Sequence, residues 1–396
     1  MEKVTELCTG CRVCEQLCPK HCIEMVTDSE GFLTARIDQD SCIGCGLCAR
    51  RCPQNRGGLR HETAQETWAA RLKNDEVLYR SASGGAFAGM ALHVIHEGGA
   101  VFGVRWDKDY KAIHDKAETE EALWPLLSSK YVQSDTGHTY SEVKALLQTG
   151  RKVLYSGTGC QIAGLKTYLN KEYDNLITID LVCHGVTSPL LFQKYIELLA
   201  HKHHAKIEEY DFRDKSGGWG LGYKYKYKYK YKYKYKYGIS PLDPYYKHFL
   251  DGNAYRMCCY SCKYANTERC GDITIADFWG IERCHPGFYS HKGVSLVLVN
   301  SEKGKRFWQI AKEDFQTLKS KLEYATKENH NLKRPTKPDV LVRSHIYEGI
   351  NTLSPEDFFA QRFPLHPNIA DYAKNILPMG MKLALKKILW KIKRMK

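Results

Sequence analysis

Nine of the chain's 16 cysteines lie before residue 53, and eight of them have spacings that suit metal ligation. Two copies of the pattern Cys-x2-Cys-x2-Cys-x3-Cys-Pro hold them, namely Cys8, Cys11, Cys14, Cys18, Cys42, Cys45, Cys48 and Cys52. Three thiolates on a tight loop can reach three corners of an iron–sulfur cubane when two residues separate each pair. The fourth cysteine follows after a turn that proline restricts, and it points toward the other cluster. We therefore expect two [4Fe-4S] clusters, one held by Cys8, Cys11, Cys14 and Cys52, the other by Cys42, Cys45, Cys48 and Cys18.

This repeated spacing is that of bacterial two-cluster ferredoxins. Zinc is the alternative, but zinc sites mostly use two separated pairs of ligands, which this pattern does not resemble. Cys22 lies outside the pattern, and we expect it to be a small buried thiol. Apolar residues 23–26 and 32–37 flank a turn at 28–31, which predicts a β-hairpin covering the clusters.

The later cysteines suggest a further metal centre. Cys160 and Cys183 each follow a predicted buried strand, at 152–155 and 176–182, and sites assemble at such strand ends in open α/β sheets. Cys259-x2-Cys262 could add two ligands to make a third [4Fe-4S] cluster. Competing ligands are Cys258, Cys270 and, less so, Cys284. Buried thiols or a zinc site remain alternatives to this cluster.

Two turns in the rest of the chain could bind an anion. Ser83-Gly84-Gly85 opens a predicted helix, and its backbone amides could face a phosphate. Residues 156–161 join the strand at 152–155 to a second predicted helix, a strand–turn–helix unit of the kind used for phosphates or cofactors. Taken alone, each turn could equally be no more than a helix start.

Several blocks together resemble the beta-subunit family of coenzyme F420 hydrogenases and dehydrogenases. The resemblance runs from about Trp68 to about Lys305, behind the ferredoxin module. Its blocks are 83–85, 129–134, 157–165, 180–185, 212–215, 259–262, 272–280 and 292–295. It is the order of the blocks over more than 200 residues, and no single one, that identifies the family.

The resemblance implies an FAD-type flavin and, beside it, a further [4Fe-4S] cluster held by Cys160, Cys183, Cys259 and Cys262. The chain departs from the family pattern at Gly159, where proline is usual, and at Ala276, where glycine is common. Neither change bears on the implied cofactors. Family members act on different substrates, so the deazaflavin substrate does not carry over to this chain.

A few residues are candidates for contact with that flavin. These are Ser83, Gly84, Gly85 and Thr158, together with Lys130, whose charge could lie near the flavin phosphates or the reduced ring. Lys130 could instead be an ordinary surface lysine. His184 is a weak candidate for a proton donor, and a structural role beside Cys183 is the alternative. The catalytic residues are otherwise unknown.

The net charge of +14 is concentrated in two segments, 223–237 and 382–396, and the remaining chain is formally neutral. The first segment alternates Tyr and Lys, which would place all Tyr on one face of a strand and all Lys on the other. Such a surface could bind nucleic acid by stacking and charge, but we interpret it as a repeat expanded inside a hairpin or loop. We therefore do not expect nucleic acid as a partner.

The second segment, 381–396, has its apolar residues on one helical face and cations around them. This pattern suits a helix lying on an anionic membrane surface, or alternatively one docked on the protein's own body. The N-terminus lacks an apolar signal region and no apolar run is long enough to span a bilayer. We therefore expect a cytoplasmic protein that could lie peripherally at the inner membrane face.

We predict an α+β protein with four parts. Residues 1–60 form a ferredoxin-like two-cluster module, 61–148 and 149–345 a mixed α/β flavin and iron–sulfur domain, and 346–396 a tail with an amphipathic helix. The predicted function is that of an oxidoreductase that passes electrons between the clusters and a flavin. A non-catalytic electron-transfer subunit serving a partner enzyme is the alternative. The expected partner is a redox protein or a small-molecule substrate.

Overall fold

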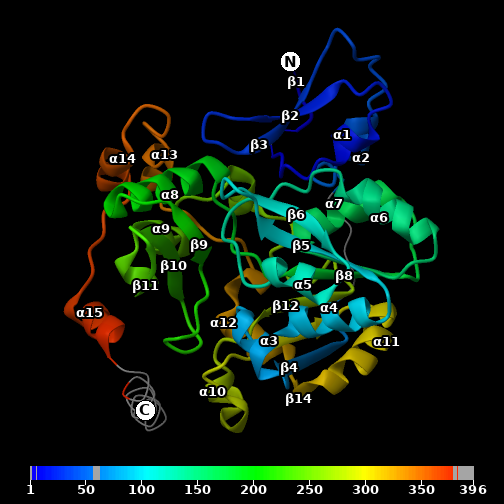
Figure 1. The fold of residues 1–396 in the computed structure, drawn as a ribbon. Helices are drawn as coiled ribbons and strands as arrows, with labels where there is room; N and C mark the ends of the chain where they lie inside the picture. The colour runs from blue at the N-terminus through cyan, green and yellow to red at the C-terminus, as the bar shows by residue number, and fades with distance from the viewer. Residues whose placement is uncertain (1, 6, 57–62, 378–380, 382–396) are drawn as a thin grey trace.

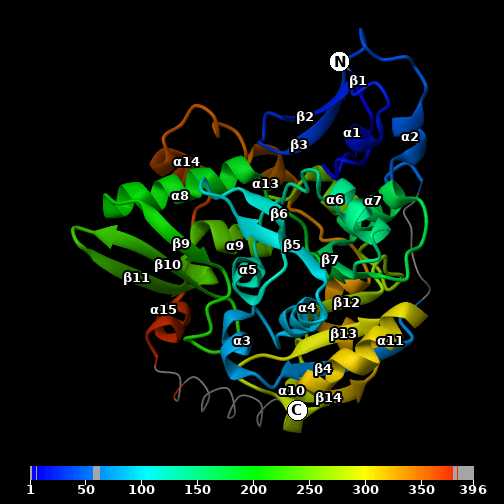
Figure 2. The ribbon, with the colours of Figure 1, turned by 45° about the vertical axis from the view of Figure 1, so that its right-hand side comes forward.

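The computed structural model describes residues 2–5, 7–56, 63–377 and 381. An eight-stranded mixed sheet forms its centre, in the order β14-β4-β13-β12-β8-β7-β5-β6 (Figures 1 and 2). The strands are β4 (Glu66–Leu72), β5 (Ala100–Trp106), β6 (Ala112–Ala117), β7 (Val153–Thr158), β8 (Leu176–Leu181), β12 (Ile273–Asp277), β13 (Ser295–Val299) and β14 (Phe315–Ser320). The pairs β5/β7, β7/β8 and β8/β12 are parallel and the other pairs are antiparallel. Residues on both sides of position 148 therefore share one sheet.

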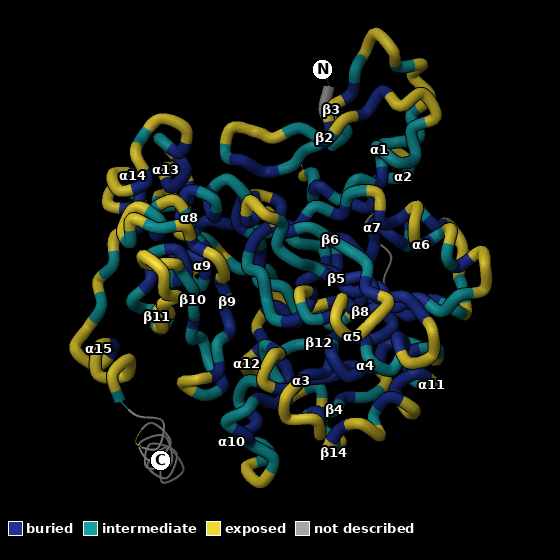
Figure 3. Tube along the Cα trace, in the orientation of Figure 1, coloured by how far each residue is buried: buried dark blue, intermediate teal, exposed yellow. Residues whose placement is uncertain are grey.

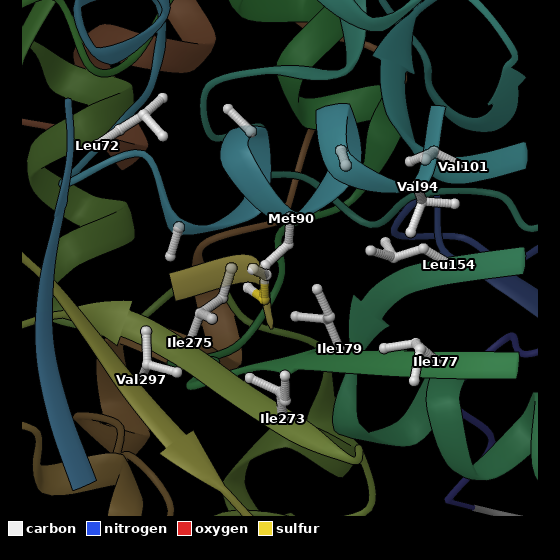
Figure 4. Packing of buried hydrophobic residues seen from close by; sticks show 14 of the residues in the cluster. Leu72, Met90, Val94, Val101, Leu154, Ile177, Ile179, Ile273, Ile275 and Val297 are labelled. Carbon is white, nitrogen blue, oxygen red and sulfur yellow. The ribbon is translucent and has the colours of Figure 1, made fainter. Parts of the chain in front are cut away.

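Helices cover both faces of this sheet, which explains why its central strands are continuous apolar runs. On one face lie α3 (Asp75–Arg80), α4 (Ala86–His96) and α11 (Glu302–Ala311), and Met90 and Val94 pack against Leu154, Ile179 and Ile273 (Figure 4). On the other face lie α6 (Thr139–Gln148) and α7 (Gly159–Leu169). Figure 3 shows the sheet as the most buried part of the molecule. The strands and helices predicted around 83–104 and 152–182 are confirmed.

The N-terminal residues form a small module with its own sheet, ordered β1-β3-β2. Its elements are β1 (Glu2–Lys3), α1 (Val13–Leu17), β2 (Ile23–Thr27), β3 (Leu33–Ile37) and α2 (Leu47–Arg51). β2 and β3 pair antiparallel around the turn at 28–31, as the sequence predicts. The module lies on the side of the body that presents α6 and α7 (Figures 1 and 2).

A third sheet, β11-β10-β9, lies on the opposite side of the molecule. It consists of β9 (Ile207–Asp211), β10 (Gly222–Tyr229) and β11 (Lys232–Ile239), and an aromatic core joins it to α8 (Pro189–His203) and α9 (Pro244–Asp251). The Tyr-Lys repeat is the hairpin β10–β11, which pairs Tyr of one strand with Lys of the other. Each face of the hairpin therefore carries both residue types, although each single strand segregates them as predicted.

The remaining helices are α5 (Glu120–Leu123), α10 (Ile281–Cys284), α12 (Leu322–Glu328), α13 (Val340–His345), α14 (Pro355–Arg362) and α15 (Ile369–Ile376). Within the described ranges, no helix has both the length and the apolar character needed to cross a membrane. The basic amphipathic helix predicted at 381–396 falls outside the described residues except for Met381, which is exposed. The fold is the predicted α+β arrangement of a ferredoxin-like module and a mixed α/β domain.

Candidate redox site

The four thiols predicted to hold the first cluster face one small cavity in the N-terminal module. Cys8, Cys11, Cys14 and Cys52 line it together with Val13 and Ala35. Burial raises the pKa of Cys11 to about 12, with the nearby Cys8 and Cys52 adding to the shift. Free thiols are therefore costly to ionise here, and a bound cation must compensate for thiolate charge. The amide of Gly10 donates to the sulfur of Cys8 over 3.4 Å.

The other ligand set lies at the far end of the module. Burial raises the pKa of Cys48, and Cys42 and Cys45 lie close enough to raise it further. Cys18 approaches from the first motif, with its sulfur 3.4 Å from that of Cys22. Cys22 is buried among Ile23, Ala35 and Ile37, as expected for a small buried thiol. Cys45 is exposed, so this end of the module faces solvent.

The first-cluster side of the module is the side that contacts the body. Arg256 donates from Nε to the carbonyl oxygen of Cys8 (2.7 Å) and from Nη1 to that of Leu33 (2.6 Å). Gln133 donates to Thr9 O (3.2 Å) and accepts from the amide of Leu33 (3.0 Å). A Cβ on Gly10 would lie 2.5 Å from Gln133 Nε2, and Gly10 has φ +73°, so glycine permits this close approach.

Further contacts hold the module in place around this interface. Arg12 forms a two-pronged ion pair with Asp135, and its charge holds the pKa of that carboxyl below its usual range although burial opposes the shift. Arg343 makes an equivalent pair with Glu30 at 2.8 and 2.6 Å. The module is thus fixed against the body by charged hydrogen bonds.

Five of the later cysteines meet in one cavity of about 300 Å³, reached from three separate segments. Cys160 opens α7, Cys183 follows β8, and Cys258, Cys259 and Cys262 lie on or beside a short 3-10 helix, Met257–Ser261. Burial raises the pKa of Cys183 to about 12, and Cys262 and Cys258 are near enough to contribute. The structure therefore brings together Cys160, Cys183, Cys259 and Cys262, and also the competitor Cys258.

The two other competitors lie elsewhere. Cys270 is buried outside the cavity lining, and its amide donates to Asp180. Cys284 lies on α10, where its thiol contacts the carbonyl oxygens of Gly280 and Ile281.

Two arginines beside these thiols were not predicted from the sequence. Arg269 is almost wholly buried, pairs with Asp180 at 3.2 Å, and lowers the pKa values of Cys183 and Cys262 by its positive charge, against the effect of burial. Arg256 acts in the same direction on Cys258. Both side chains line the cavity. No motif marks them, since only the tertiary fold brings them to the thiols.

The flavin-contact candidates lie in the same cavity wall, with one exception. Ser83, Gly85, Lys130 and Thr158 line it, and Thr158 Oγ1 lies 3.1 Å from the sulfur of Cys160. Gly84 lies behind the wall, where a Cβ would collide with Ala70 of β4 and Ser295 of β13. Thr9 and Gln54 of the N-terminal module complete the wall.

Lys130 and His184 both line the cavity, and burial disfavours their charged forms. Lys130 Nζ donates to the carbonyl oxygens of Pro125 (2.8 Å) and Leu127 (2.6 Å), and burial lowers its pKa to about 7. Burial also lowers the pKa of His184, which Asp277 opposes by its negative charge. His184 is therefore neutral at pH 7, while Lys130 is poised between its two forms.

A buried ion pair between Arg213 and Asp277 stabilises another part of the cavity wall. Arg213 binds Asp277 with two hydrogen bonds of 2.7 and 2.8 Å, and Trp219 Nε1 donates to the same carboxylate at 2.7 Å. The rings of Trp219 and Trp279 stack 4.9 Å apart beneath the guanidinium. In the sequence, block 212–215 was recognisable only as part of the family resemblance. The structure shows that it supplies Arg213.

Two segments of the chain match known protein families. Residues 150–323 match the C terminus of the "Coenzyme F420 hydrogenase/dehydrogenase, beta subunit" family, and residues 7–56 match the "4Fe-4S dicluster domain". No curated protein matches the chain. Among solved structures, a chain of the F420-reducing [NiFe] hydrogenase complex from Methanosarcina barkeri is similar, with 17% identity and a TM-score of 0.42. The match covers 77% of this chain and 94% of that chain.

The two family matches cover the segments that carry both groups of cysteines. The dicluster match spans all eight N-terminal ligand candidates, and the beta-subunit match spans Cys160, Cys183, Cys259 and Cys262. The chain is therefore an iron–sulfur protein whose N-terminal residues match 4Fe-4S dicluster domains and whose residues 150–323 match the C-terminal part of the coenzyme F420 hydrogenase/dehydrogenase beta subunit.

Proposed function

We propose that the chain is an oxidoreductase in which a third [4Fe-4S] cluster links the two N-terminal clusters to a flavin. The observation that carries this proposal is one shared cavity. Its wall contains the five later thiols, two helix-start turns, Lys130 and two residues of the N-terminal module. A cluster and an anionic cofactor that bind side by side would explain why thiols and helix-start turns line the same cavity.

The number of thiols suits a [4Fe-4S] cubane, which needs four ligands. Cys160, Cys183 and Cys262 approach from three segments, with Cys259 or the adjacent Cys258 as the fourth ligand. Arg256 and Arg269 bring positive charge, which offsets the negative charge of thiolates and cluster in a buried site. The resemblance of the sequence favours Cys259 over Cys258.

Two helix starts in the wall of the same cavity suit a phosphate-bearing flavin. Helices α4 and α7, of eleven residues each, begin after Gly85 and Thr158 in this wall, and a capping box between Thr158 and Gln161 satisfies part of the α7 start. Helix N-termini favour anions through free amides and the helix dipole. The volume of about 300 Å³ is at the lower end of the range for small-molecule pockets.

Residues of the chain would hold protons near the bound flavin and keep the Ser83 turn in place. Lys130 can hold a proton near an anionic group, and neutral His184 can donate or accept one at its ring nitrogens. Lys215 holds the Ser83 turn through a 2.6 Å hydrogen bond to its carbonyl oxygen. A bound flavin would supply the coupling of one-electron to two-electron chemistry.

The positions of the two N-terminal cysteine sets suggest which end of the module a redox partner would contact. The second N-terminal set ends in solvent at Cys45, beside Ile43, whose side chain is 60% exposed. The first set lies against the body through Arg256 and Gln133. A redox protein would therefore exchange electrons at the Cys45 end, and a small-molecule substrate would react in the cavity.

The stoichiometry of the anaerobically purified protein tests this proposal. We expect about twelve iron and twelve sulfide, three cubanes at four each, with one flavin per chain. About eight iron without flavin would overturn it and leave an electron carrier.

A non-catalytic electron-transfer subunit is a second candidate, favoured by the exposed Cys45 end. Reduction of an artificial acceptor by the isolated chain distinguishes the two. Turnover by the chain alone supports the oxidoreductase, and activity that requires a second protein supports the non-catalytic role.

A further inference from the structure

We propose that the hairpin β10–β11 and helix α15 together form a surface that docks on an anionic lipid bilayer. This goes beyond the redox function and does not depend on it. The surface is made of residues 228–237 and 369–376, and both segments lie on the side of the molecule opposite the N-terminal module (Figures 1 and 2). Both views place α15 beside the hairpin, and α15 contacts the 3-10 turn Ser240–Leu242 that follows β11.

Helix α15 has its apolar face exposed with respect to the described part of the chain. Ile369 and Ile376 are 89% and 80% exposed, and Tyr372 between them is half exposed. Asp371 is the residue of this helix that is buried, and it closes a capping box with Asn368. A helix docked on its own body would bury the isoleucines instead. Exposing them to water is unfavourable, so a covering apolar phase is expected.

The hairpin adds aromatic rings and positive charge to the same side. Its outer face pairs Lys226 with Tyr235 and Lys228 with Tyr233 across the strands, while Tyr223 and Tyr225 of the other face are buried against Tyr210. Tyr231 at the tip is 97% exposed. Tyrosine and lysine side chains are both suited to the headgroup region, where ring and stem are apolar and the end groups stay hydrated.

The charge of the hairpin is mostly unbalanced. Of its seven lysines, the described part of the chain provides ion-pair partners for two, Glu209 for Lys226 (2.7 Å) and Asp214 for Lys224 (4.0 Å). Of the five others, Lys228 lies on the outer face and Lys230 in the turn, whereas Lys232, Lys234 and Lys236 share the face of Tyr225. Residues 228–237 are exposed on both faces, so all five can contribute to attraction of an anionic surface at the protruding end of the hairpin. Nucleic acid would use the lysines and tyrosines but not the exposed isoleucines of α15, so the combined surface favours lipid.

Such docking would leave the redox partner's access open. Helix α2, which begins two residues after the exposed Cys45, lies on the side of the molecule away from the hairpin and α15, so a bilayer there would not cover this end (Figures 1 and 2).

Vesicle co-sedimentation of the full-length protein tests this inference. We expect the wild-type protein to bind vesicles that contain phosphatidylglycerol at least tenfold more tightly than vesicles of phosphatidylcholine alone. Two variants should each weaken binding to the anionic vesicles at least tenfold. One is I369S/Y372S/I376S, and the other replaces Lys228, Lys230, Lys232 and Lys234 by Gln. Replacing the same four lysines by Arg should preserve binding.

A matched control uses exposed apolar residues elsewhere. Val340 and Leu341 on α13 are similarly exposed but lie away from the hairpin, so V340S/L341S should change binding by less than twofold. The visible absorbance of the clusters and the melting temperature verify that each variant is folded. Equal vesicle binding by wild type and both variants would overturn the inference. It would equally be overturned by binding to a single-stranded oligonucleotide without binding to vesicles, or by loss of self-association as the only effect of the variants.

Discussion

Arg256 Nε donates a 2.7 Å hydrogen bond to the carbonyl oxygen of Cys8, and the same side chain lines the cavity beside Cys258. One guanidinium therefore contacts the first N-terminal cysteine loop and the later cysteine loop at once. Its second bond, to Leu33 O, holds the β-hairpin of the module. The two cysteine groups, some 250 residues apart in sequence, are joined through this residue.

Replacing Arg256 by Leu should loosen this junction. Two partly buried carbonyl oxygens would lose charged donors, which we expect to lower the free energy of unfolding by about 2–4 kcal/mol. Urea denaturation followed by cluster absorbance measures the change. Arg283→Leu is the matched control, because Arg283 is 53% exposed in its ion pairs with Glu282 and Glu328, and such surface pairs are worth about 1 kcal/mol or less. Equal losses in both variants would contradict a special role for Arg256.

Single serine substitutions should identify the ligands of the third cluster. Cys160→Ser and Cys183→Ser should reduce the iron content from about twelve to about eight per chain, because a thiolate ligand is lost. Cys284→Ser should leave it unchanged, since Cys284 lies on α10 outside the cavity. Comparison of Cys258→Ser with Cys259→Ser shows which of the two is the fourth ligand. Full iron content in Cys160→Ser would exclude the proposed ligand set.

The ion pair between Arg213 and Asp277 should contribute strongly to the stability of the cavity wall. Asp277→Leu leaves the buried guanidinium without its partner, so we expect a loss of about 3–5 kcal/mol in unfolding free energy. The double variant Arg213→Met/Asp277→Leu removes both charges and should recover much of that loss. Denaturant midpoints of the two variants make the comparison. A double variant as unstable as the single one would show that packing, and not charge, dominates here.

Flavin binding should depend on pH through Lys130. Burial lowers the pKa of Lys130 to about 7, so its positive charge is present below pH 7 and is lost as the pH rises. The affinity for flavin mononucleotide, an anion, should therefore fall between pH 6 and 8, by up to about tenfold per pH unit above the pKa. Fluorescence titration of flavin-depleted protein measures this affinity.

Two controls isolate the charge effect. Riboflavin has no phosphate, so its affinity should vary little over the same range. Lys130→Met should bind the mononucleotide weakly at every pH and remove the slope. An unchanged slope in Lys130→Met would place the titrating group elsewhere.

The sequence alone determined the parts of this protein that depend on local spacing. The eight N-terminal ligand candidates follow from two copies of a short motif, because loop geometry restricts which thiols can reach one cubane. Continuous apolar runs predicted the central strands β5, β7 and β8, and the turns before α4 and α7 marked their helix starts. The family resemblance singled out Cys160, Cys183, Cys259 and Cys262, and the structure places all four along one cavity.

Only the tertiary structure decided which distant residues share a site. Cys160 and Cys183 meet because the parallel strands β7 and β8 end at one edge of the sheet, and the loop that carries Cys262 packs into the same cavity. The contacts of Arg256, Arg269 and Arg213 join segments far apart in sequence, and no local pattern encodes them. The hairpin register likewise placed lysine opposite tyrosine, although alternation within each strand had suggested separate faces. Spacing along the chain determines local geometry, whereas burial, charge pairing and strand register arise only when segments far apart in sequence pack together.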